Sequence, residues 1–175
     1  ADEFSTFARP PTRVPEPLDL NEVIEEAAHL MEQETGTDQI EMALHPEPLV
    51  VEADREELRR LYINLIKNAL QAIPDERTGH VRIATTTGTD AKGNRVVQCR
   101  VIDNGTGIPP DLRGKIFEPN FSTKTSGTGL GLAIAQKTVD EMGGHIGFDT
   151  TEGEGTTFWV QLPLVEDDGG DVDYD

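Results

Sequence analysis

Two glycine-rich stretches and one acidic residue carry the strongest chemical signal in this sequence. Asp103 ends an apolar run and is followed at once by Gly105 and Gly107, so the backbone is expected to pass close to a flat neighbour there. Glycines recur at alternate positions over residues 127–131, just before the apolar residues of an expected helix. The start of a helix presents free N–H groups and the positive end of the helix dipole, which suits phosphate. The pattern predicts a carboxylate that reads a base and, farther along the chain, a phosphate cradle.

Two carboxamides supply a second set of candidate ligands. Asn64 and Asn68 lie four residues apart in a helix expected over residues 54–73, so they share one face and stand one turn from each other. An apolar stripe that begins at Leu58 runs along the same helix. Two neighbouring amides can bind a metal ion or phosphate, and taken alone they can equally bridge nearby backbone. The run from Asp103 to Gly107, taken alone, is likewise compatible with an ordinary turn.

The order of these motifs resembles that of a known family. The sequence contains neither a P-loop motif nor the G-x-G-x-x-G dinucleotide motif. Four boxes in series are similar to those of sensor histidine kinase ATP-binding domains, which belong to the GHKL ATPases together with DNA gyrase B and mismatch-repair MutL. The resemblance covers about residues 17–165. The boxes are Asn64 with Asn68, Asp103-x-Gly105-x-Gly107, Phe117 to Phe121, and Gly127-x-Gly129-x-Gly131.

This resemblance implies ATP and Mg²⁺ as ligands. Asp103 is expected to accept the exocyclic amine of adenine, whereas guanine would set a carbonyl against it. Asn68 is implied as the Mg²⁺ ligand and Asn64 as the residue that orients phosphate or metal-bound water; with Lys124 they form the implied catalytic set. The two glycines after Asp103 are expected to leave room for the ring. The further positions implied to contact the nucleotide are Gly105, Gly107, Ile108, Phe117, Thr125, Gly127, Thr128, Gly129, Leu130 and Gly131.

Two positions depart from the pattern of relatives. Many family members carry a basic residue three positions after the metal-binding Asn, where this sequence has Gln71, so Lys124 is the nearest replacement. Gyrase-like ATPases and serine-kinase relatives place a Glu four residues before that Asn. Here the position is Asn64, which cannot accept a proton at neutral pH. A reaction that needs little protein base is therefore favoured, such as direct attack by a neutral imidazole nitrogen.

The resemblance implies the ATP-binding catalytic domain of a two-component sensor histidine kinase. Such a domain transfers the γ-phosphoryl group of ATP to a histidine on a dimerisation domain of the same protein, and a response regulator receiver domain is its indirect partner. The dimerisation hairpin is expected ahead of Ala1, with the fragment monomeric, binding ATP without phosphorylating itself, and the parent a homodimer. The alternatives are a GHKL protein serine kinase or ATPase, and a non-catalytic interaction module. No phosphoacceptor context surrounds any histidine present, namely His29, His45, His80 and His145.

Composition limits the partners. With 33 acidic against 15 basic residues, the net charge is −18, which argues against binding to bare nucleic acid or anionic lipid. This acidity either reflects a salt-adapted source or is an ordinary soluble surface. The single cysteine, Cys99, excludes an internal disulfide. No apolar run is long enough for a membrane helix and no leader is visible, so a cytoplasmic domain is expected, from a parent that can still be membrane-anchored.

The elements that must position these residues form an α+β two-layer sandwich. Hydrophobic periodicity predicts a mixed, mostly antiparallel sheet covered on one face by three helices. The resemblance implies the same architecture, the Bergerat or GHKL fold. Asp19 is expected to cap the first helix and Gly36 to end it. The expected strands cover residues 18–20, 40–44, 49–51, 81–85, 95–102, 145–148 and 156–162, and the expected helices 19–36, 54–73 and 131–142.

The chain divides into one domain and two short flanks. Residues 17–165 are expected to form the domain. Residues 1–16 resemble the end of a dimerisation-hairpin helix and a proline-rich linker, or are a plain N-terminal arm, and residues 166–175 are an acidic tail predicted to be disordered. Phe117 and Phe121 are expected either to clip a lid over residues 118–128 to the domain or to be plain core aromatics.

Overall fold

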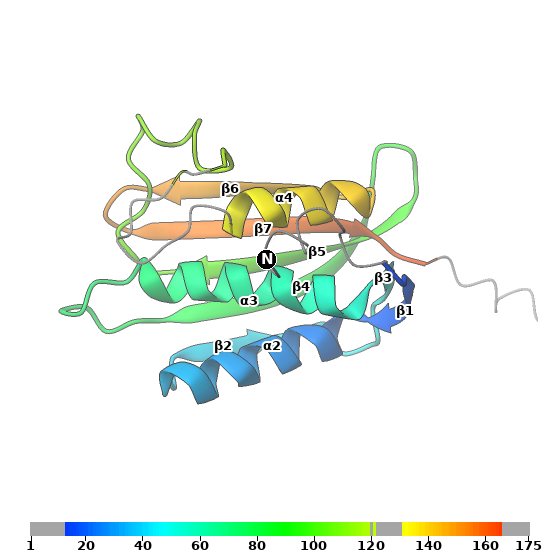
Figure 1. Ribbon diagram of the computed structural model, residues 1–175, viewed down its shortest axis with the longest axis horizontal. Helices are drawn as coiled ribbons and strands as arrows, with labels where there is room; N and C mark the ends of the chain where they lie inside the picture. The colour runs from blue at the N-terminus through cyan, green and yellow to red at the C-terminus, as the bar shows by residue number, and fades with distance from the viewer. Residues whose placement is uncertain (1–12, 120, 122–130, 166–175) are drawn as a thin grey trace, which may run out of the picture.

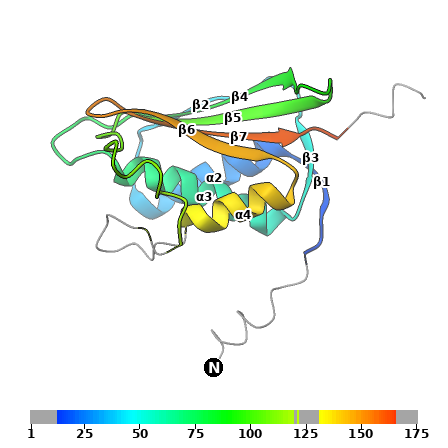
Figure 2. The same cartoon turned by 90° about the horizontal axis from the view of Figure 1, so that it is seen from above.

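The described part of the protein forms two layers, with a sheet on one side and the helices on the other (Figures 1 and 2). The computed structural model describes residues 13–119, 121 and 131–165. This arrangement confirms the predicted α+β sandwich. The helices are α2 (Leu20–Thr35), α3 (Arg55–Gln71) and α4 (Gly131–Glu141), and the strands are β1 (Glu16–Asp19), β2 (Ile40–Ala43), β3 (Val50–Ala53), β4 (Val81–Thr89), β5 (Arg95–Asp103), β6 (His145–Thr151) and β7 (Gly155–Pro163).

The main sheet has the strand order β2-β4-β5-β7-β6. Only β2 and β4 pair in parallel among these strands, and the remaining neighbours pair antiparallel, as predicted for a mixed, mostly antiparallel sheet. The parallel pair needs a crossover, and α3 supplies it. The β4–β5 hairpin sets Val81 opposite Asp103. Asp103 therefore ends a strand that is hydrogen-bonded on both sides.

Strand β3 lies outside the main sheet. Residues 40–44 and 49–51 were expected as two strands joined by a turn, and they do not pair with each other. Instead β3 pairs antiparallel with β1 in a small two-stranded sheet. Its other edge receives the chain just beyond β7, because the amide of Val165 donates to the carbonyl of Val50 at 2.9 Å. Figure 1 shows this small sheet beside the end of β7.

Capping residues mark the helix ends close to where the sequence predicts them. Asp19 Oδ1 accepts the amide of Asn21 at 3.1 Å, which caps α2, and also the amide of Leu49 at 3.0 Å. Gly36 ends α2 in the left-handed conformation, with φ of 70°. Asp54 caps α3 by accepting the amide of Glu57 at 3.1 Å. Helices α3 and α4 begin or end within two residues of their expected limits.

The core fills the space between the layers. Alternate residues of β4, β5 and β7 face the helices, and the apolar stripe of α3 packs onto them. Cys99 is buried among them as a free thiol, in keeping with its single occurrence. The core members with a relative exposure of 0% are Leu20, Val23, Ile24, Ala27, Ala28, Val51, Leu58, Tyr62, Leu65, Ile66, Val81, Ile83, Val97, Val139 and Leu162. None of the helices in the described part of the chain is both long and apolar enough to cross a membrane.

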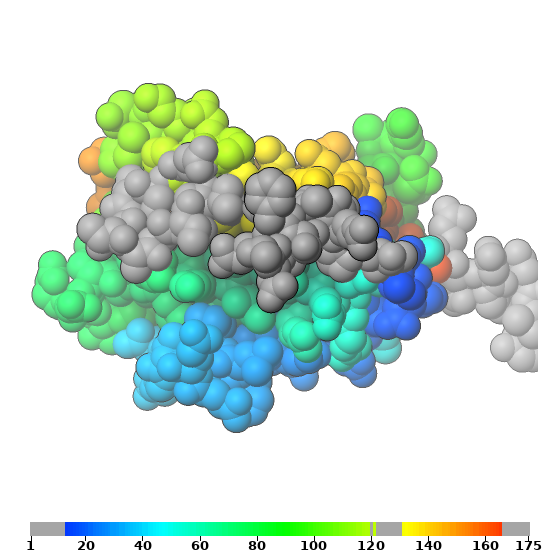
Figure 3. All heavy atoms as spheres, in the orientation of Figure 1, coloured from blue at the N-terminus to red at the C-terminus, as the bar shows by residue number. Residues whose placement is uncertain are grey.

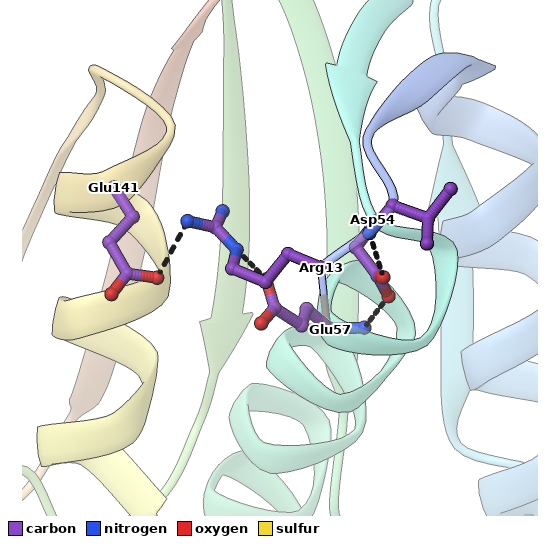
Figure 4. A network of polar contacts seen from close by, with 5 residues as sticks. Arg13, Asp54, Glu57 and Glu141 are labelled. Carbon is purple, nitrogen blue, oxygen red and sulfur yellow. Dashed lines mark hydrogen bonds and ion pairs between the residues drawn. The ribbon is translucent and has the colours of Figure 1, made fainter. Parts of the chain in front are cut away.

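The segment before β1 is attached to α3 and α4. Arg13 forms ion pairs with Glu57 of α3 through Nε at 2.9 Å and with Glu141 of α4 through Nη1 at 3.0 Å. The Val14 amide donates to Asp54 Oδ2 at 3.0 Å (Figure 4). Of the flank predicted over residues 1–16 as the end of a dimerisation-hairpin helix and a proline-rich linker, residues 1–12 lie outside the described residues, and so does the acidic tail over residues 166–175.

Candidate functional site

Asp103 is a buried carboxylate at the end of β5. Its relative exposure is 6%, and Oδ1 accepts the amides of Gly105 at 2.9 Å and Thr156 at 3.2 Å. A buried charge is costly unless hydrogen bonds replace its water, and amides that donate to an anion form strong ones. The Thr156 amide comes from β7, so two elements fix the carboxylate. The side chain is therefore rigid before any ligand binds.

The two glycines after Asp103 lie so close to neighbouring backbone that a side chain would not fit at either position. A Cβ at Gly105 would lie 2.5 Å from the carbonyl oxygen of Ala72, at the C-terminal end of α3. Gly107 has φ of 72°, and a Cβ there would collide with the carbonyl of Thr151. These glycines were expected to leave room for a ring. In the structure, the absence of side chains at these positions lets the loop after β5 pass between α3 and the β6–β7 turn.

The carboxamides of α3 stand near this loop. Asn64 Nδ2 donates weakly to the carbonyl of Gly131 at 3.4 Å, which joins α3 to the first residue of α4. Asn68 is half-buried one turn farther along the same helix. At the end of that helix, the carbonyl of Ala72 accepts the amide of Thr106 at 3.1 Å. Helix α3 therefore connects three of the predicted boxes, namely the carboxamide pair, the loop after Asp103 and the start of α4.

The aromatic box begins as part of the core. Phe117 packs against Phe148 of β6, with ring centroids 6.1 Å apart, and against Phe158 of β7 at 6.5 Å. These contacts anchor the segment over residues 109–119, which stands at one corner of the helix-bearing side (Figure 3). Ile108 also packs against the core, and its amide donates to Thr150 Oγ1 at 2.9 Å. The structure shows Phe117 partly buried against the core, and its contact with the lid stays a prediction.

Several predicted residues lie outside the described part of the chain. They belong to the segment between the aromatic box and α4, so their approach to the site stays a prediction. They are Lys124, Thr125, Gly127, Thr128, Gly129 and Leu130.

Four residues near Asp103 were not predicted. The Thr156 amide holds the carboxylate, and a Cβ on Gly155, whose φ is 139°, would collide with the Asp103 carbonyl. Arg77 Nη1 donates to the carbonyls of Asn104 and Gly105, both at 2.7 Å. The Asn104 side chain accepts the His80 amide at 2.8 Å and donates to the Thr78 carbonyl at 2.9 Å. Since most of these contacts use backbone atoms of distant segments, no local sequence pattern marks them.

The side-chain oxygens of the α3 carboxamides suit a magnesium ion that binds together with a phosphate-bearing ligand. Within the described residues, no group of three or more His, Cys, Asp or Glu side chains could hold a metal ion by itself. Mg²⁺ keeps several waters and takes phosphate oxygens together with one or two protein oxygens. The half-buried Asn68 beside Asn64 offers an oxygen ligand of that kind. The residues present therefore fit Mg²⁺ bound together with a nucleotide.

Comparisons with known proteins agree with this geometry. Residues 53–166 match the family described as histidine kinase-, DNA gyrase B-, and HSP90-like ATPase. The nitrogen regulation protein NtrY of Azorhizobium caulinodans is 37% identical over 171 residues, which cover 93% of this chain and 21% of that protein. The chain thus spans only part of the curated relatives it matches; for example, it covers 46% of the sensory histidine kinase/phosphatase NtrB of Rhizobium leguminosarum bv. phaseoli.

Solved structures give the same result. The catalytic domain of histidine kinase ThkA superposes with a TM-score of 0.71 at 36% identity, covering 86% of this chain and 95% of that one. Full-length ShkA, solved in complex with AMPPNP, superposes with a TM-score of 0.70 at 30% identity over 89% of this chain and 32% of that one. The chain therefore belongs to the histidine kinase-, DNA gyrase B- and HSP90-like ATPases, and within them to the ATP-binding catalytic domains of sensor histidine kinases.

Proposed function

We propose that this domain binds ATP with Mg²⁺ and transfers the γ-phosphoryl group to a histidine on a dimerisation domain of the same protein. The observation that carries the proposal is the Asp103 carboxylate, which occupies a buried position of β5 on the face covered by the helices, together with the link from the α3 carboxamide Asn64 to the start of α4. The named relatives are histidine kinases, which favours this reaction over that of a protein serine kinase. The AMPPNP complex of ShkA supports an ATP-type ligand.

Base recognition would rest on Asp103. A carboxylate only accepts hydrogen bonds, so it suits the exocyclic amine of adenine, while the carbonyl of guanine would face it with a second acceptor. Two backbone amides already hold Oδ1, so the side chain loses little rotational freedom when the base binds. Selectivity for adenine over guanine follows from this fixed acceptor.

Phosphate binding would rest on α3 and α4. Asn68 is proposed as the protein ligand of Mg²⁺, which would neutralise phosphate charge when bound, and Asn64 as the group that orients phosphate or water. Gly131 opens α4, whose free N–H groups and dipole favour an anion. Neither carboxamide can take up a proton at neutral pH, so the nucleophile must be reactive by itself. A neutral imidazole nitrogen meets that condition, and catalysis then depends on positioning and charge neutralisation.

The reaction also implies partners. The dimerisation domain would present the histidine, a receiver domain of a response regulator would take the phosphoryl group from it, and the parent protein would be a homodimer. We place this relay in the cytoplasm, where ATP is available. Lys124 remains the proposed basic contact to phosphate, in place of the neutral Gln71.

The test combines binding with transfer. Calorimetry should record ATP binding that strengthens when Mg²⁺ is added, and labelled γ-phosphate should then pass to a supplied histidine-bearing dimerisation domain from the same protein. Glu52, which is exposed on β3 in the small sheet, provides a control, because Glu52→Gln removes one charge outside both the main sheet and the loop after β5. Absence of ATP binding to the unaltered domain, with or without Mg²⁺, would overturn the proposal. Binding without any transfer would restrict it to nucleotide recognition.

A further inference from the structure

Arg77 lies in the connection between α3 and β4, and its guanidinium contacts backbone instead of a carboxylate. Its Nη1 donates to the carbonyl oxygens of Asn104 and Gly105, both at 2.7 Å. These are the two residues directly after Asp103. Over residues 13–119, 121 and 131–165, no carboxylate lies within ion-pair distance of Arg77, although the chain has 33 acidic and 15 basic residues. The contact is therefore specific to the loop after β5.

Each of the two carbonyls belongs to a peptide unit that is held at both ends. In a trans peptide the C=O and the N–H point in opposite directions. The unit between Asn104 and Gly105 donates its N–H to Asp103 Oδ1 at 2.9 Å, while its C=O faces Arg77. The unit between Gly105 and Thr106 donates its N–H to the Ala72 carbonyl at 3.1 Å, while its C=O also faces Arg77. One nitrogen of Arg77 thus fixes the orientation of both units.

We propose that Arg77 is a positioning residue for base recognition, acting through the Asn104–Gly105 peptide unit on the Asp103 carboxylate. A cation on the carbonyl polarises the amide and makes its N–H a better donor to the anion on the other side. Without the guanidinium the peptide unit is free to rotate, and the carboxylate loses one of the two amides that aim it. This inference rests on the proposed function, because it assigns Arg77 to the recognition of adenine by Asp103.

The loop has a second attachment that is independent of Arg77. The Asn104 side chain accepts the His80 amide at 2.8 Å and donates to the Thr78 carbonyl at 2.9 Å. These bonds keep the loop next to the α3–β4 connection when the guanidinium is removed. The expected effect of substitution is therefore a local change in the two peptide units, with the domain still folded.

Three variants test the inference. Arg77→Met removes both hydrogen bonds, Arg77→Lys leaves one ammonium that can reach both carbonyls, and Arg82→Met removes an exposed arginine of β4 as the matched control. Affinity for adenosine and for Mg²⁺-ATP is measured by NMR titration and calorimetry at a temperature where circular dichroism shows each variant fully folded. Arg77→Met should weaken both ligands by the same factor, roughly tenfold, which corresponds to one charged hydrogen bond. Arg77→Lys should lose less, and Arg82→Met should match the unaltered domain.

Hydrogen exchange and phosphoryl transfer supply readouts that a purely structural role would not move. The Gly105 amide should lose protection from exchange in Arg77→Met, while amides in the middle of β5 keep theirs. The rate of transfer at saturating ATP should stay unchanged, while the KM for ATP rises.

Unchanged adenosine affinity in Arg77→Met would overturn the inference. A loss of affinity confined to ATP would also overturn it, since it would place Arg77 on the phosphates. If Arg77→Met does not fold, Arg77→Gln replaces it. The inference then requires Arg77→Lys to keep more adenosine affinity and more Gly105 protection than Arg77→Gln, and equal behaviour of those two variants overturns it. If adenosine binding in the otherwise unaltered domain survives Asp103→Asn, the proposed function fails instead.

Discussion

Asp103 shows how one atom can fix the character of a site. Oδ1 accepts amides from the following loop and from β7, so two backbone groups distant in the sequence orient the carboxylate. An acceptor fixed in this way distinguishes an amine from a carbonyl on a bound base. The same geometry predicts the effect of an isosteric substitution of Asp103 on base binding.

Asp103→Asn should exchange acceptor for donor with little change in shape. The Asn oxygen can still accept both amides, so the fold persists, but the amide nitrogen then meets the amine of adenine as a second donor. Affinity for ATP should fall by roughly 100-fold, the scale of losing a charged hydrogen bond and leaving a buried group unpaired. Calorimetry with ATP and with inosine triphosphate measures both affinities. Relative to ATP, inosine triphosphate should bind better to the variant than to the unaltered domain, because the hypoxanthine carbonyl can accept from the Asn amide. An unchanged ATP-to-inosine-triphosphate ratio would contradict this assignment.

Gly105→Ala should destabilise the domain. The added Cβ would lie 2.5 Å from the Ala72 carbonyl oxygen, so either the loop or the end of α3 must move. Overpacking of this kind costs about 1–3 kcal/mol in the free energy of unfolding. Urea titration gives that free energy, and Gly88→Ala is the control, because a Cβ at Gly88 meets nothing within 4 Å. Equal stability of the two variants would show that the loop is not packed against α3.

Residue types were predicted better than residue contacts. Asn64, Asn68 and Asp103 were proposed as site residues because their spacing and the glycines around them form recognisable boxes. Arg77 and Thr156 were not, because they reach Asp103 or its loop from segments distant in the sequence through backbone groups. The backbone contacts that Gly105 and Gly107 permit were also not predicted. A sequence shows that a side chain must be absent, but only the packing shows what occupies its place.

At the scale of elements, Asp54 serves two segments at once. Oδ1 caps α3 through the Glu57 amide, and Oδ2 receives the Val14 amide from the segment ahead of β1. Arg13 then spans α3 and α4 beside it (Figure 4). Exposed ion pairs contribute little stability singly, so the cap and the Val14 bond are the more important part of this junction. The junction links the chain ahead of the domain to both helices of the proposed site.

Protonation of Asp54 at low pH should weaken its hydrogen bond with the Val14 amide. The Val14 amide, followed by the Glu57 amide, holds the pKa of Asp54 below its ordinary value of 3.8. A carboxyl whose folded pKa is depressed stabilises the fold above its ordinary pKa and loses that contribution as the pH falls through the folded pKa. The Val14 amide resonance should therefore titrate with a midpoint below 3.8. Asp54→Asn should abolish that titration, whereas Asp38→Asn, in an exposed turn, should leave it intact. A Val14 midpoint above the ordinary carboxyl value would contradict the assignment.

Hydrophobic periodicity was sufficient for the elements but not for all pairings. Alternation in residues 81–89 and 95–103 and the apolar stripe of α3 each reflect one buried face, which is a local property of the sequence. Strand β3 instead pairs with β1 across the whole of α2. Such long-range pairing depends on where the layers meet, so two adjacent apolar runs gave no sign of it.

At the scale of the whole molecule, the surplus of acid sets the response to salt. With a net charge of −18, repulsion within the folded domain outweighs the few ion pairs, so added salt should raise stability. An ordinary acidic surface predicts that the rise ends near about 0.3 M NaCl, where screening is already short-ranged, and a salt-adapted one predicts a continued rise beyond about 1 M. Urea midpoints from low to molar NaCl distinguish the two. A midpoint that falls with salt would show that attractive pairs dominate instead.

The small β1–β3 sheet has one more consequence. Val50 lies opposite Asp19 of β1, and its carbonyl accepts the amide of Val165 on the other edge. Strand spacing puts the first and last parts of the domain about 10 Å apart across β3. A short peptide could therefore join them, and the chain could be reopened in the exposed β4–β5 turn over residues 90–94. Such a circular permutant would keep every strand pairing, because none of them requires a free end.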